Sequence, residues 1–343
     1  MTPPPSSMSR PKTAVLLCNL GTPDAPTPAA LRRYLGEFLS DQRVVELPRL
    51  LWWPILHGII LRVRPGKSAK KYASIWMRDG DKSGSPLRVW TERQAIALDE
   101  QLRTAGLNVT VRYAMRYGSP SIAQQLDALQ AEGVQRILIL PAYPQYSGTT
   151  TASVVDAVAH WTGKIRSLPE LRFVNRYHDD PGYISALAAR IDAHWQQHGR
   201  PDGTSSKLVL SFHGLPERNR TLGDPYYDEC QTTARLLAEA LRLTPEQYLV
   251  TFQSRFGAAK WLQPYTEPTV MALARAGVQR VDVACPGFTS DCIETLEEID
   301  QEVREAFLTS GGQEFRYIPC LNDEAEWIKA LGHIAQRHVS GWM

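Results

Sequence analysis

The sequence predicts an α/β protein with two Rossmann-like αβα domains, each built on a four-stranded parallel sheet, and a cleft between them. Short β-type runs alternate with helical patterns, as expected for parallel strands joined by helical crossovers. An internal repeat supports two similar halves. ALQAEGVQR at residues 128–136 returns as ALARAGVQR at 272–280, and AVLLCNLGTP at 14–23 returns as KLVLSFHGLP at 207–216. Matches in the same order indicate two copies of one architecture.

Eight short apolar runs are predicted to be strands, because turn signals or charged segments bound each of them. They are residues 14–18, 109–113, 137–140, 171–175, 208–212, 248–252, 281–284 and 315–319. Helical patterns fill the intervals between strands and follow the last strand. They cover residues 28–39, 92–104, 119–132, 150–162, 183–197, 228–241, 267–276, 293–309 and 323–338.

These elements define the expected domain organisation. Residues 1–12 are rich in proline and serine and lack the apolar stretch of a signal peptide, so we expect a disordered tail. The first domain is expected at residues 13–163 and the second at 164–322. The helix predicted within residues 323–343 follows the second sheet, and we expect it to pack back on the first domain.

Composition excludes several classes of function. A hydrophobic content of 43% and a charged content of 22% are typical of a soluble globular protein. The net charge of +2 and the absence of a Lys/Arg block give no sign of a nucleic-acid partner. Five cysteines without a C-x-x-C pair fit a reduced cytoplasmic compartment. No G-x-G-x-x-G follows the first strand, and no G-x-S-x-G is present, so neither a dinucleotide cofactor nor an α/β-hydrolase is supported.

One histidine stands where an α/β sheet binds its ligand. His213 ends the strand predicted at 208–212, and Gly214 follows it directly. Ligands of open α/β sheets bind at the carboxyl ends of strands, and an imidazole there can accept a proton or ligate a transition metal. The alternative is a half-buried histidine bonded only to backbone. Leu20 is aligned with His213 in the repeat, so we expect an apolar residue and a histidine on opposite walls of the cleft.

A second candidate site is the acidic segment at residues 285–302. Asp291 and Glu294 fit the first turn of a helix as capping-box residues near the positive end of the helix dipole. That explanation does not cover Glu298 and Glu302, which continue a row at every fourth position although like charges at that spacing repel. We therefore predict a path for cations or protons along this row.

His213 and Glu294 follow strands of the same half, so they are expected to meet at the edge of its sheet. One imidazole and one carboxylate form an open site for a divalent ion such as ferrous iron. So sparse a set of ligands suits a metal that is handed on rather than stored. Cys285 and Cys292 flank this region, but their spacing does not favour a structural zinc site.

The strongly apolar segment at residues 47–61 is too short to cross a bilayer, which takes about 20 residues, and Pro54 interrupts it. Trp52 and Trp53 are of a residue type that favours membrane interfaces, and arginines flank the segment. We interpret it as an apolar lip that rests on a membrane. The alternative is a pair of helices buried in the core.

Three longer segments together resemble the ferrochelatase family: SFHGLPERNRTLGDPY at 211–226, TFQSRFGAAKWLQPYT at 251–266 and CPGFTSDCIETLEEID at 285–300. The similarity extends over nearly the whole chain and looks closest to the enzymes of Gram-negative bacteria. It implies insertion of ferrous iron into protoporphyrin IX, the last step of protoheme synthesis, and a chelatase-like fold with the porphyrin in the cleft. It also implies a cytoplasmic enzyme in peripheral contact with the inner face of the cell membrane. No motif identifies an iron-donor protein.

Position by position, the resemblance implies that His213 is the site histidine, which binds metal or accepts the pyrrole protons. Glu294 matches its carboxylate partner, and Glu298 and Glu302 match an acidic row that leads outward. Residues 47–61 match the lip at the mouth of the cleft. The porphyrin-binding residues that the resemblance implies are Leu20, Tyr72, Ser85, Arg116, Tyr117, Trp261 and Phe288.

Two departures from the family pattern matter. Cys292 stands where many relatives have histidine, so no second imidazole is available at that position. Relatives with a two-iron, two-sulfur cluster carry a cysteine-rich C-terminal extension and a further ligand where this chain has Gly148, whereas no cysteine follows Cys320 here. We therefore expect no iron–sulfur cluster and no prosthetic group, with ferrous iron as a substrate only.

Two other functions stay open from the sequence. One is a chelatase of different specificity, which inserts iron into coproporphyrin III or cobalt into a related tetrapyrrole. The other is a tetrapyrrole or metal carrier on the same fold, without catalysis.

Overall fold

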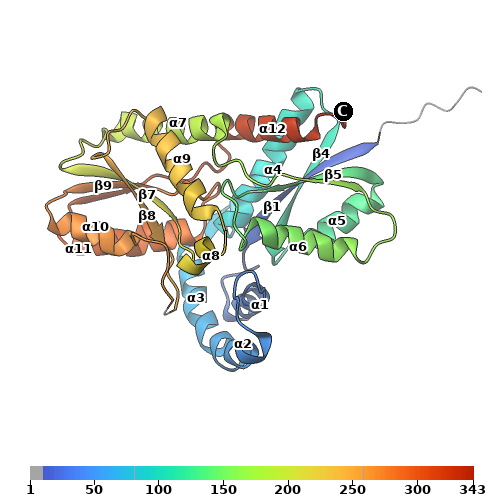
Figure 1. The fold of residues 1–343 in the computed structure, drawn as a ribbon, viewed down its shortest axis with the longest axis horizontal. Helices are drawn as coiled ribbons and strands as arrows, with labels where there is room; N and C mark the ends of the chain where they lie inside the picture. Colours follow the sequence, from blue (N-terminus) through green and yellow to red (C-terminus); the bar gives the residue numbers. More distant parts are fainter. Residues whose placement is uncertain (1–10, 81, 258) are drawn as a thin grey trace, which may run out of the picture.

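The structure is a computed structural model that describes residues 11–80, 82–257 and 259–343, so most of the tail expected at 1–12 lies outside the described residues. Two α/β domains lie side by side, and the segment with α1 to α3 projects from the first of them (Figure 1). The predicted fold class is confirmed: both main sheets have four parallel strands.

The first sheet has the strand order β4-β1-β5-β6. Strand β1 (Lys12–Gly21) lies between β4 (Val109–Tyr117) and β5 (Val134–Pro141). Strand β6 (Glu170–Phe173) pairs with β5 and forms an edge. The domain boundary predicted after residue 163 is therefore wrong, because the chain completes the first sheet with β6 before it enters the second domain.

The second sheet has the order β10-β9-β7-β8. Its strands are β7 (Ser206–His213), β8 (Tyr248–Gln253), β9 (Arg280–Ala284) and β10 (Glu314–Tyr317). In both sheets the first strand along the chain lies between the second and the third, and the fourth forms the edge beside the third. The sequence repeat thus corresponds to a repeated strand order.

Helices cover both faces of each sheet, which is why the central strands are apolar without alternation. Leu16 of β1 packs in the cluster of α5 (Ile122–Ala131) and α6 (Thr151–Thr162), while Leu17 faces the cluster of α4 (Pro86–Thr104). In the second domain, α7 and α9 pack on one face, and α10, η2 and α11 pack on the other. Their bounds are α7 (Pro181–His198), α8 (Glu217–Thr221), α9 (Tyr226–Ala240), α10 (Thr266–Arg275), η2 (Glu294–Val303) and α11 (Arg304–Thr309).

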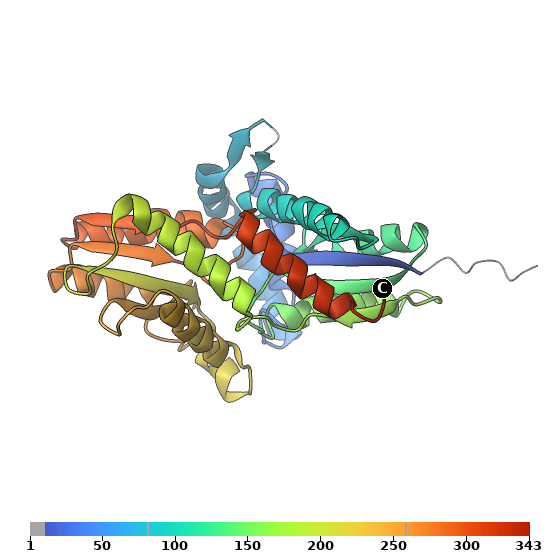
Figure 2. The same ribbon diagram turned by 90° about the horizontal axis from the view of Figure 1, so that it is seen from above.

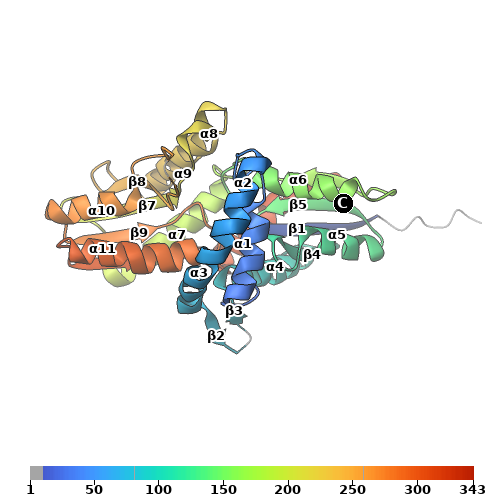
Figure 3. The same ribbon diagram turned by 90° about the horizontal axis from the view of Figure 1, so that it is seen from below.

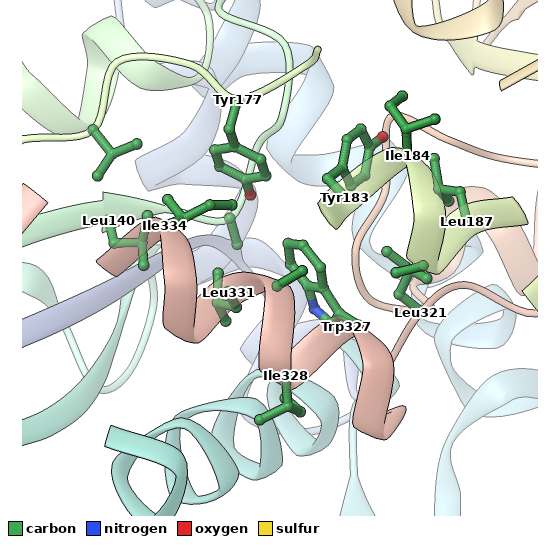
Figure 4. Packing of buried hydrophobic residues seen from close by; sticks show 14 of the residues in the cluster. Leu140, Tyr177, Tyr183, Ile184, Leu187, Leu321, Trp327, Ile328, Leu331 and Ile334 are labelled. Carbon is green, nitrogen blue, oxygen red and sulfur yellow. The ribbon is translucent and has the colours of Figure 1, made fainter. Parts of the chain in front are cut away.

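The C-terminal helix α12 (Ala325–Val339) joins the two domains. It contacts α4 and β5 of the first domain, as expected, and also α7 of the second. Seen from above, α7 and α12 run along the same side of both domains (Figure 2). Trp327 of α12 packs against Tyr177 and Tyr183, with ring centroids 6.0 and 5.9 Å away (Figure 4). One hydrophobic cluster therefore includes residues of both domains.

The segment between β1 and α4 forms the projection. Helix α1 (Pro28–Leu39) starts at Thr27, whose hydroxyl accepts a hydrogen bond from the Ala30 backbone N–H. A second, continuous helical stretch consists of the α-helix α2 (Arg49–Ile55), a turn of π-helix called η1 (Leu56–Ile60) and the α-helix α3 (Leu61–Ile75). A small antiparallel pair, β2 (Met77–Asp79) and β3 (Lys82–Gly84), leads into α4. Seen from below, α1 to α3 cross the region where the two domains meet (Figure 3).

Candidate active site

Two glycines build the repeated strand-to-loop turns. Gly214 follows His213, and a Cβ at this glycine would lie 2.6 Å from a backbone oxygen of β8. Gly21 follows Leu20, has a φ of +113°, and a Cβ there would lie 1.8 Å from a backbone oxygen of β4. Only glycine fits such close approaches of backbone. These turns therefore hold Leu20 and His213 at equivalent carboxyl ends of the two central strands.

The ring of His213 is held in one tautomer. Its Nδ1 lies 2.6 Å from the carbonyl oxygen of Gly214. A carbonyl oxygen only accepts, so Nδ1 carries the proton and donates it. The Nε2 atom of this half-buried ring therefore keeps its lone pair for a metal ion or a proton. The ring of Phe288 lies beside it, 6.4 Å away between centroids.

A cavity of ≈ 630 Å³ borders His213, a volume within the range of small-molecule sites. Both domains line it. The first domain contributes apolar and aromatic side chains together with two basic ones, and the second contributes further aromatic side chains and all of the acidic ones. Its lining includes Leu20, Tyr34, Leu35, Phe38, Arg64, Tyr72, Phe252, Arg255, Phe256, Ile293, Glu294, Glu297, Glu298 and Glu302. The structure thus brings together His213, Leu20, Tyr72 and the three predicted glutamates of the row.

The acidic row lies on a π-helix. The helix predicted at residues 293–309 is not α-helical throughout, because η2 is a π-helix over ten residues before α11 begins. A π-helix has i→i+5 hydrogen bonds and is usually a single turn found at a functional site. The Gln253 side-chain amide donates to the Glu294 carbonyl oxygen over 2.7 Å and so ties the first turn to β8. Glu294, Glu298 and Glu302 all reach the cavity from this helix.

Glu298 is the most firmly held member of the row. Its Oε1 accepts from the Ser254 backbone N–H over 2.6 Å, and its Oε2 accepts from the Ser254 hydroxyl over 2.5 Å. Burial raises the pKa of Glu298, and these hydrogen bonds and the nearby His213 only partly oppose that effect. Glu298 can therefore take up a proton at higher pH than an exposed glutamate.

Asp291 does not belong to the path predicted for it. It is buried and lies outside the residues that line the cavity. Its Oδ1 accepts from the hydroxyls of Tyr317 and Thr295, and its Oδ2 accepts from the Asn322 amide over 2.7 Å. The carboxylate fixes the loop before η2, and this helix has no side-chain cap, so the structure shows neither the path nor the capping box predicted for Asp291.

Several predicted porphyrin-binding residues also lie outside the cavity lining. Ser85 is buried and accepts a hydrogen bond from Thr22 Oγ1 over 2.6 Å. Trp261 packs behind the turn of His213, where a Cβ on Gly214 would lie 3.2 Å from its indole ring. Phe288 touches the His213 ring but is not part of the cavity wall. Trp261 and Phe288 therefore pack against the His213 turn without lining the cavity.

Arg116 and Tyr117 share a hydrogen-bond partner and do not line the cavity themselves. Both donate to Asp41 Oδ2, over 2.6 Å from Arg116 Nη2 and 2.7 Å from the Tyr117 hydroxyl. The Tyr117 hydroxyl also lies 3.0 Å from Ser153 Oγ. Arg116 lines a separate cavity beside α5 and α6. Arg116 therefore lies away from the His213 cavity, whereas the Tyr117 ring lies 5.1 Å from that of Phe38 and packs behind the cavity wall.

The two tryptophans of the predicted lip have opposite environments. Trp53 is 50% exposed, whereas Trp52 is buried and its Nε1 donates to the Leu39 carbonyl oxygen over 2.7 Å. Trp52 is therefore a core residue of the projection, and the prediction that it lies on the outer surface is wrong. The exposed apolar residues here are Leu47, Leu50, Leu51, Trp53, Ile55, Ile59 and Val63, which we call the exposed lip.

Among the cavity residues that were not predicted, Glu297 and Lys71 form an ion pair. Glu297 lies one position before Glu298 and is almost fully buried. Lys71 of α3 places its Nζ 3.0 Å from Glu297 Oε2 and 2.7 Å from Glu302 Oε1. No spacing in the sequence could reveal this contact, because the partners lie in different domains.

Cys292 is buried next to the start of the row, and all five cysteines are free and buried. Burial raises the pKa of the Cys285, Cys292 and Cys320 thiols well above the usual range. Within the described ranges, no group of three or more His, Cys, Asp or Glu side chains is arranged to hold a metal ion. The site is an open arrangement of one imidazole and carboxylates rather than a closed metal cage.

The arrangement suits transfer of a cation and of protons. An imidazole with a free Nε2 can accept a proton or ligate a metal ion, and carboxylates accept protons or ligate divalent ions. The apolar and aromatic residues of the opposite side can hold a large planar ligand. No helix in the described part of the chain is long and apolar enough to cross a membrane.

Solved structures with a similar arrangement are chelatases. The chain superimposes on SirB from Bacillus subtilis with Fe3+ at a TM-score of 0.54 and 13% identity, covering 96% of each chain. It also matches CbiX, the terminal enzyme for biosynthesis of siroheme in denitrifying bacteria, at a TM-score of 0.52 and 14% identity, over 95% of this chain and all of the other. These similarities define the class of fold: the chain has the fold of the chelatases.

Sequence comparisons give the family. The family model of ferrochelatase matches residues 12–339. The chain is 64% identical over 340 residues to a protein named ferrochelatase from Polaromonas sp., which covers 99% of this chain and 90% of the relative. It is 65% identical over 331 residues to the ferrochelatase of Methylibium petroleiphilum (96% and 89%) and 56% identical over 340 residues to that of Bordetella pertussis (99% and 91%). The chain belongs to the ferrochelatase family.

Proposed function

We propose that His213 and Glu294 form the centre at which this ferrochelatase inserts Fe2+ into protoporphyrin IX to form protoheme. The observation that carries the assignment is the His213 ring, whose Nδ1 donates to Gly214 while Nε2 stays available beside a cavity that Glu294 also lines. Insertion must remove two pyrrole protons and bring a metal ion to the ring nitrogens. A free imidazole nitrogen next to a carboxylate can serve both tasks.

The mixed lining of the cavity supports the roles of the two domains. Leu20 and Tyr72 come from the first domain, next to Tyr34 and Phe38. Apolar and aromatic walls bind a porphyrin by burying its surface, and binding energy from such contacts can distort a ring toward the geometry of metal insertion. The acidic side then meets the pyrrole nitrogens, so the protons leave on the side of His213.

The acidic row serves as the path for the protons or the incoming ion. Glu294, Glu298 and Glu302 succeed one another along η2 from His213 to the exposed end of the cavity. The raised pKa of Glu298, caused by burial, favours proton uptake from the inner end of the row. Carboxylate oxygens are also suitable transient ligands for a divalent ion.

We propose further that the protein carries no iron–sulfur cluster. Such a cluster takes four cysteine thiolates in most proteins. Cys18 and Cys230 lie in separate hydrophobic clusters, away from the cluster that contains Cys285 and Cys320.

We infer that the exposed lip rests on the inner face of the cell membrane and that the rest of the protein stays in the cytoplasm. Leu50 and Leu51 are 92% and 66% exposed at the tip of the projection, and large apolar side chains in such a group mark an interaction surface. Arg49 and Arg62 are exposed on the same helical stretch and suit anionic headgroups. Free thiols fit a reducing compartment.

The test of the catalytic assignment is His213→Ala, assayed with Fe2+ and protoporphyrin IX by the absorbance of the heme product. We expect kcat to fall by about 10²–10⁴-fold, the usual contribution of a general base, while porphyrin binding measured by fluorescence changes little. His333→Ala, at an exposed histidine of α12, is the matched control. Insertion by the His213 variant at the wild-type rate would contradict the assignment. Parallel assays with coproporphyrin III define the substrate preference.

A further inference from the structure

Lys71 connects the helix that carries the exposed lip to the acidic row. Its ammonium nitrogen lies 3.0 Å from Glu297 Oε2 and 2.7 Å from Glu302 Oε1. Lys71 belongs to α3 of the first domain, whereas both glutamates belong to η2 of the second. The neighbouring Ser74 hydroxyl lies 3.3 Å from the Gln301 side-chain oxygen, so α3 and η2 are in direct contact along this turn.

The carboxylates of the row and of the adjacent Glu297 are neutralised unequally. Glu298 is bonded to the uncharged Ser254, and its carboxylate has no ion-pair partner within the described ranges. Glu297 and Glu302 share the single charge of Lys71. Among the ion pairs of the described residues, no other one joins a lysine or arginine to a glutamate of η2. The outer end of the row is therefore occupied by the protein's own cation, and the inner end is not.

Without Lys71, the carboxylates of Glu297 and Glu302 would form a pair with no neutralising cation. Two glutamates that can both reach one ammonium group could also ligate one divalent ion, since oxygen ligands suit Mn2+ and Fe2+. An ion held there would be stationary and distant from the pyrrole nitrogens. The Lys71 side chain is 43% exposed and that of Glu302 is 51% exposed, so the ammonium group can exchange with solvent cations.

We propose that Lys71 is a positioning residue that prevents divalent cations from being retained at Glu297 and Glu302, and thereby directs them to the His213 end of the row. This inference rests on the proposed role of the acidic row as a path. A lysine is suited to the task because its compact ammonium lies on a flexible stem and can swing away as an ion passes.

The test is Mn2+ binding to the porphyrin-free protein, followed by the loss of the EPR signal of free Mn2+. We expect Lys71→Met to bind one more Mn2+ ion per protein than the wild type at the same free concentration. Lys71→Arg, which keeps the charge, should bind as the wild type does. Lys70→Met is the matched control, because Lys70 is exposed on the same helix and its loss changes the net charge equally. Adding Glu302→Gln to Lys71→Met should abolish the additional ion.

The inference is overturned if Lys71→Met binds no more Mn2+ than the wild type, or if Lys70→Met gains the same ion. A purely structural role would lower the unfolding temperature of Lys71→Met without adding an ion, and it too would overturn the inference. The measurement needs neither porphyrin nor turnover. If the His213 assignment were wrong, His213→Ala would insert iron at the normal rate. That result is independent of Mn2+ binding, so failure of the proposed function and failure of this inference can be told apart.

Discussion

At the residue scale, the chemistry of the site depends on which atoms of each side chain already form hydrogen bonds within the protein. His213 uses Nδ1 to hold its orientation on Gly214, so only Nε2 is left for chemistry. Asp291 shows the opposite case, since both of its oxygens accept hydrogen bonds inside the protein. Residues of the same segment thus separate into a structural carboxylate and carboxylates that face the cavity.

Glu298 gives a prediction about pH. Its native pKa is raised by burial above the ordinary value of 4.5, so the native state binds more protons than the unfolded state over the interval between the two pKa values. The stability contributed by this residue is full below about pH 4.5 and declines as the pH rises through the native pKa. Glu298→Gln should remove this decline and raise the free energy of unfolding near neutral pH.

Urea unfolding at a series of pH values checks this prediction. Glu305→Gln, at a glutamate of α11 outside the cavity lining, serves as the control. The same slope of stability against pH in Glu298→Gln and in the wild type would contradict the assignment of a raised pKa to this carboxyl.

The sequence could predict the residues whose signal is local. His213, Glu294, Glu298 and Glu302 follow strand ends or a regular spacing, and the cavity contains all four of them. Lys71 could not be predicted in this way, because its partners lie in another domain and only folding brings them together. Arg116, Tyr117 and Ser85 were carried over from the resemblance alone, and the hydrogen bonds that these residues form are not encoded in a motif.

At the element scale, the π-helix is the main difference from expectation. Charge spacing indicates a helix, but α- and π-helices both place residues four apart on similar faces, so the row at Glu294 fits either. Contacts with other elements are not visible in the spacing. One example is the hydrogen bond from the Gln253 side-chain amide to the Glu294 carbonyl oxygen. The same limit applies to the lip, where periodicity could not tell Trp52 from Trp53.

The lip gives a prediction for this element. Leu50→Ser with Leu51→Ser should weaken binding to vesicles of mixed zwitterionic and anionic phospholipid at least tenfold, since burying one leucine side chain is worth about 1.5–3 kcal/mol. Ile96→Ser is the control, because Ile96 of α4 is 64% exposed elsewhere on the molecule.

Trp52→Ala should instead lower the free energy of unfolding by about 3–5 kcal/mol, as expected for a buried tryptophan.

Cosedimentation with vesicles and urea unfolding separate the two effects. Vesicle binding that survives the double leucine substitution would argue against a membrane role for the exposed lip. A stability loss below about 1 kcal/mol in Trp52→Ala would contradict its place in the core.

At the scale of the whole molecule, the two domains share a hydrophobic core. Both sheets contribute to one cluster, and α12 lies between α4 of the first domain and α7 of the second. The repeat predicted two similar sheets correctly, whereas the crossing point of the chain was placed too early, since β6 still pairs with β5. A short edge strand has little sequence pattern, and only its pairing in the folded protein shows which sheet it joins.

Trp327 tests the importance of this shared core. It is 1% exposed and packs against Tyr177 and Tyr183 (Figure 4). Trp327→Ala should cost about 3–5 kcal/mol of unfolding free energy in urea, because it leaves a cavity between the domains. Trp53→Ala, at an exposed position, should change stability by no more than about 0.5 kcal/mol. If Trp327→Ala lost no more unfolding free energy than Trp53→Ala, the packing between the domains would contribute little to stability.

The matched turns of the two halves have a consequence for symmetry. A homodimer of one half would present the same side chain at both turns, and the two faces of a bound planar ring would be treated alike. Because the halves are joined in one polypeptide, Leu20 and His213 can differ while each keeps the glycine that its turn requires. A duplicated fold can thus place different side chains on the two faces of a planar ligand. A reaction that adds an ion from one face and removes protons in a set direction needs this difference.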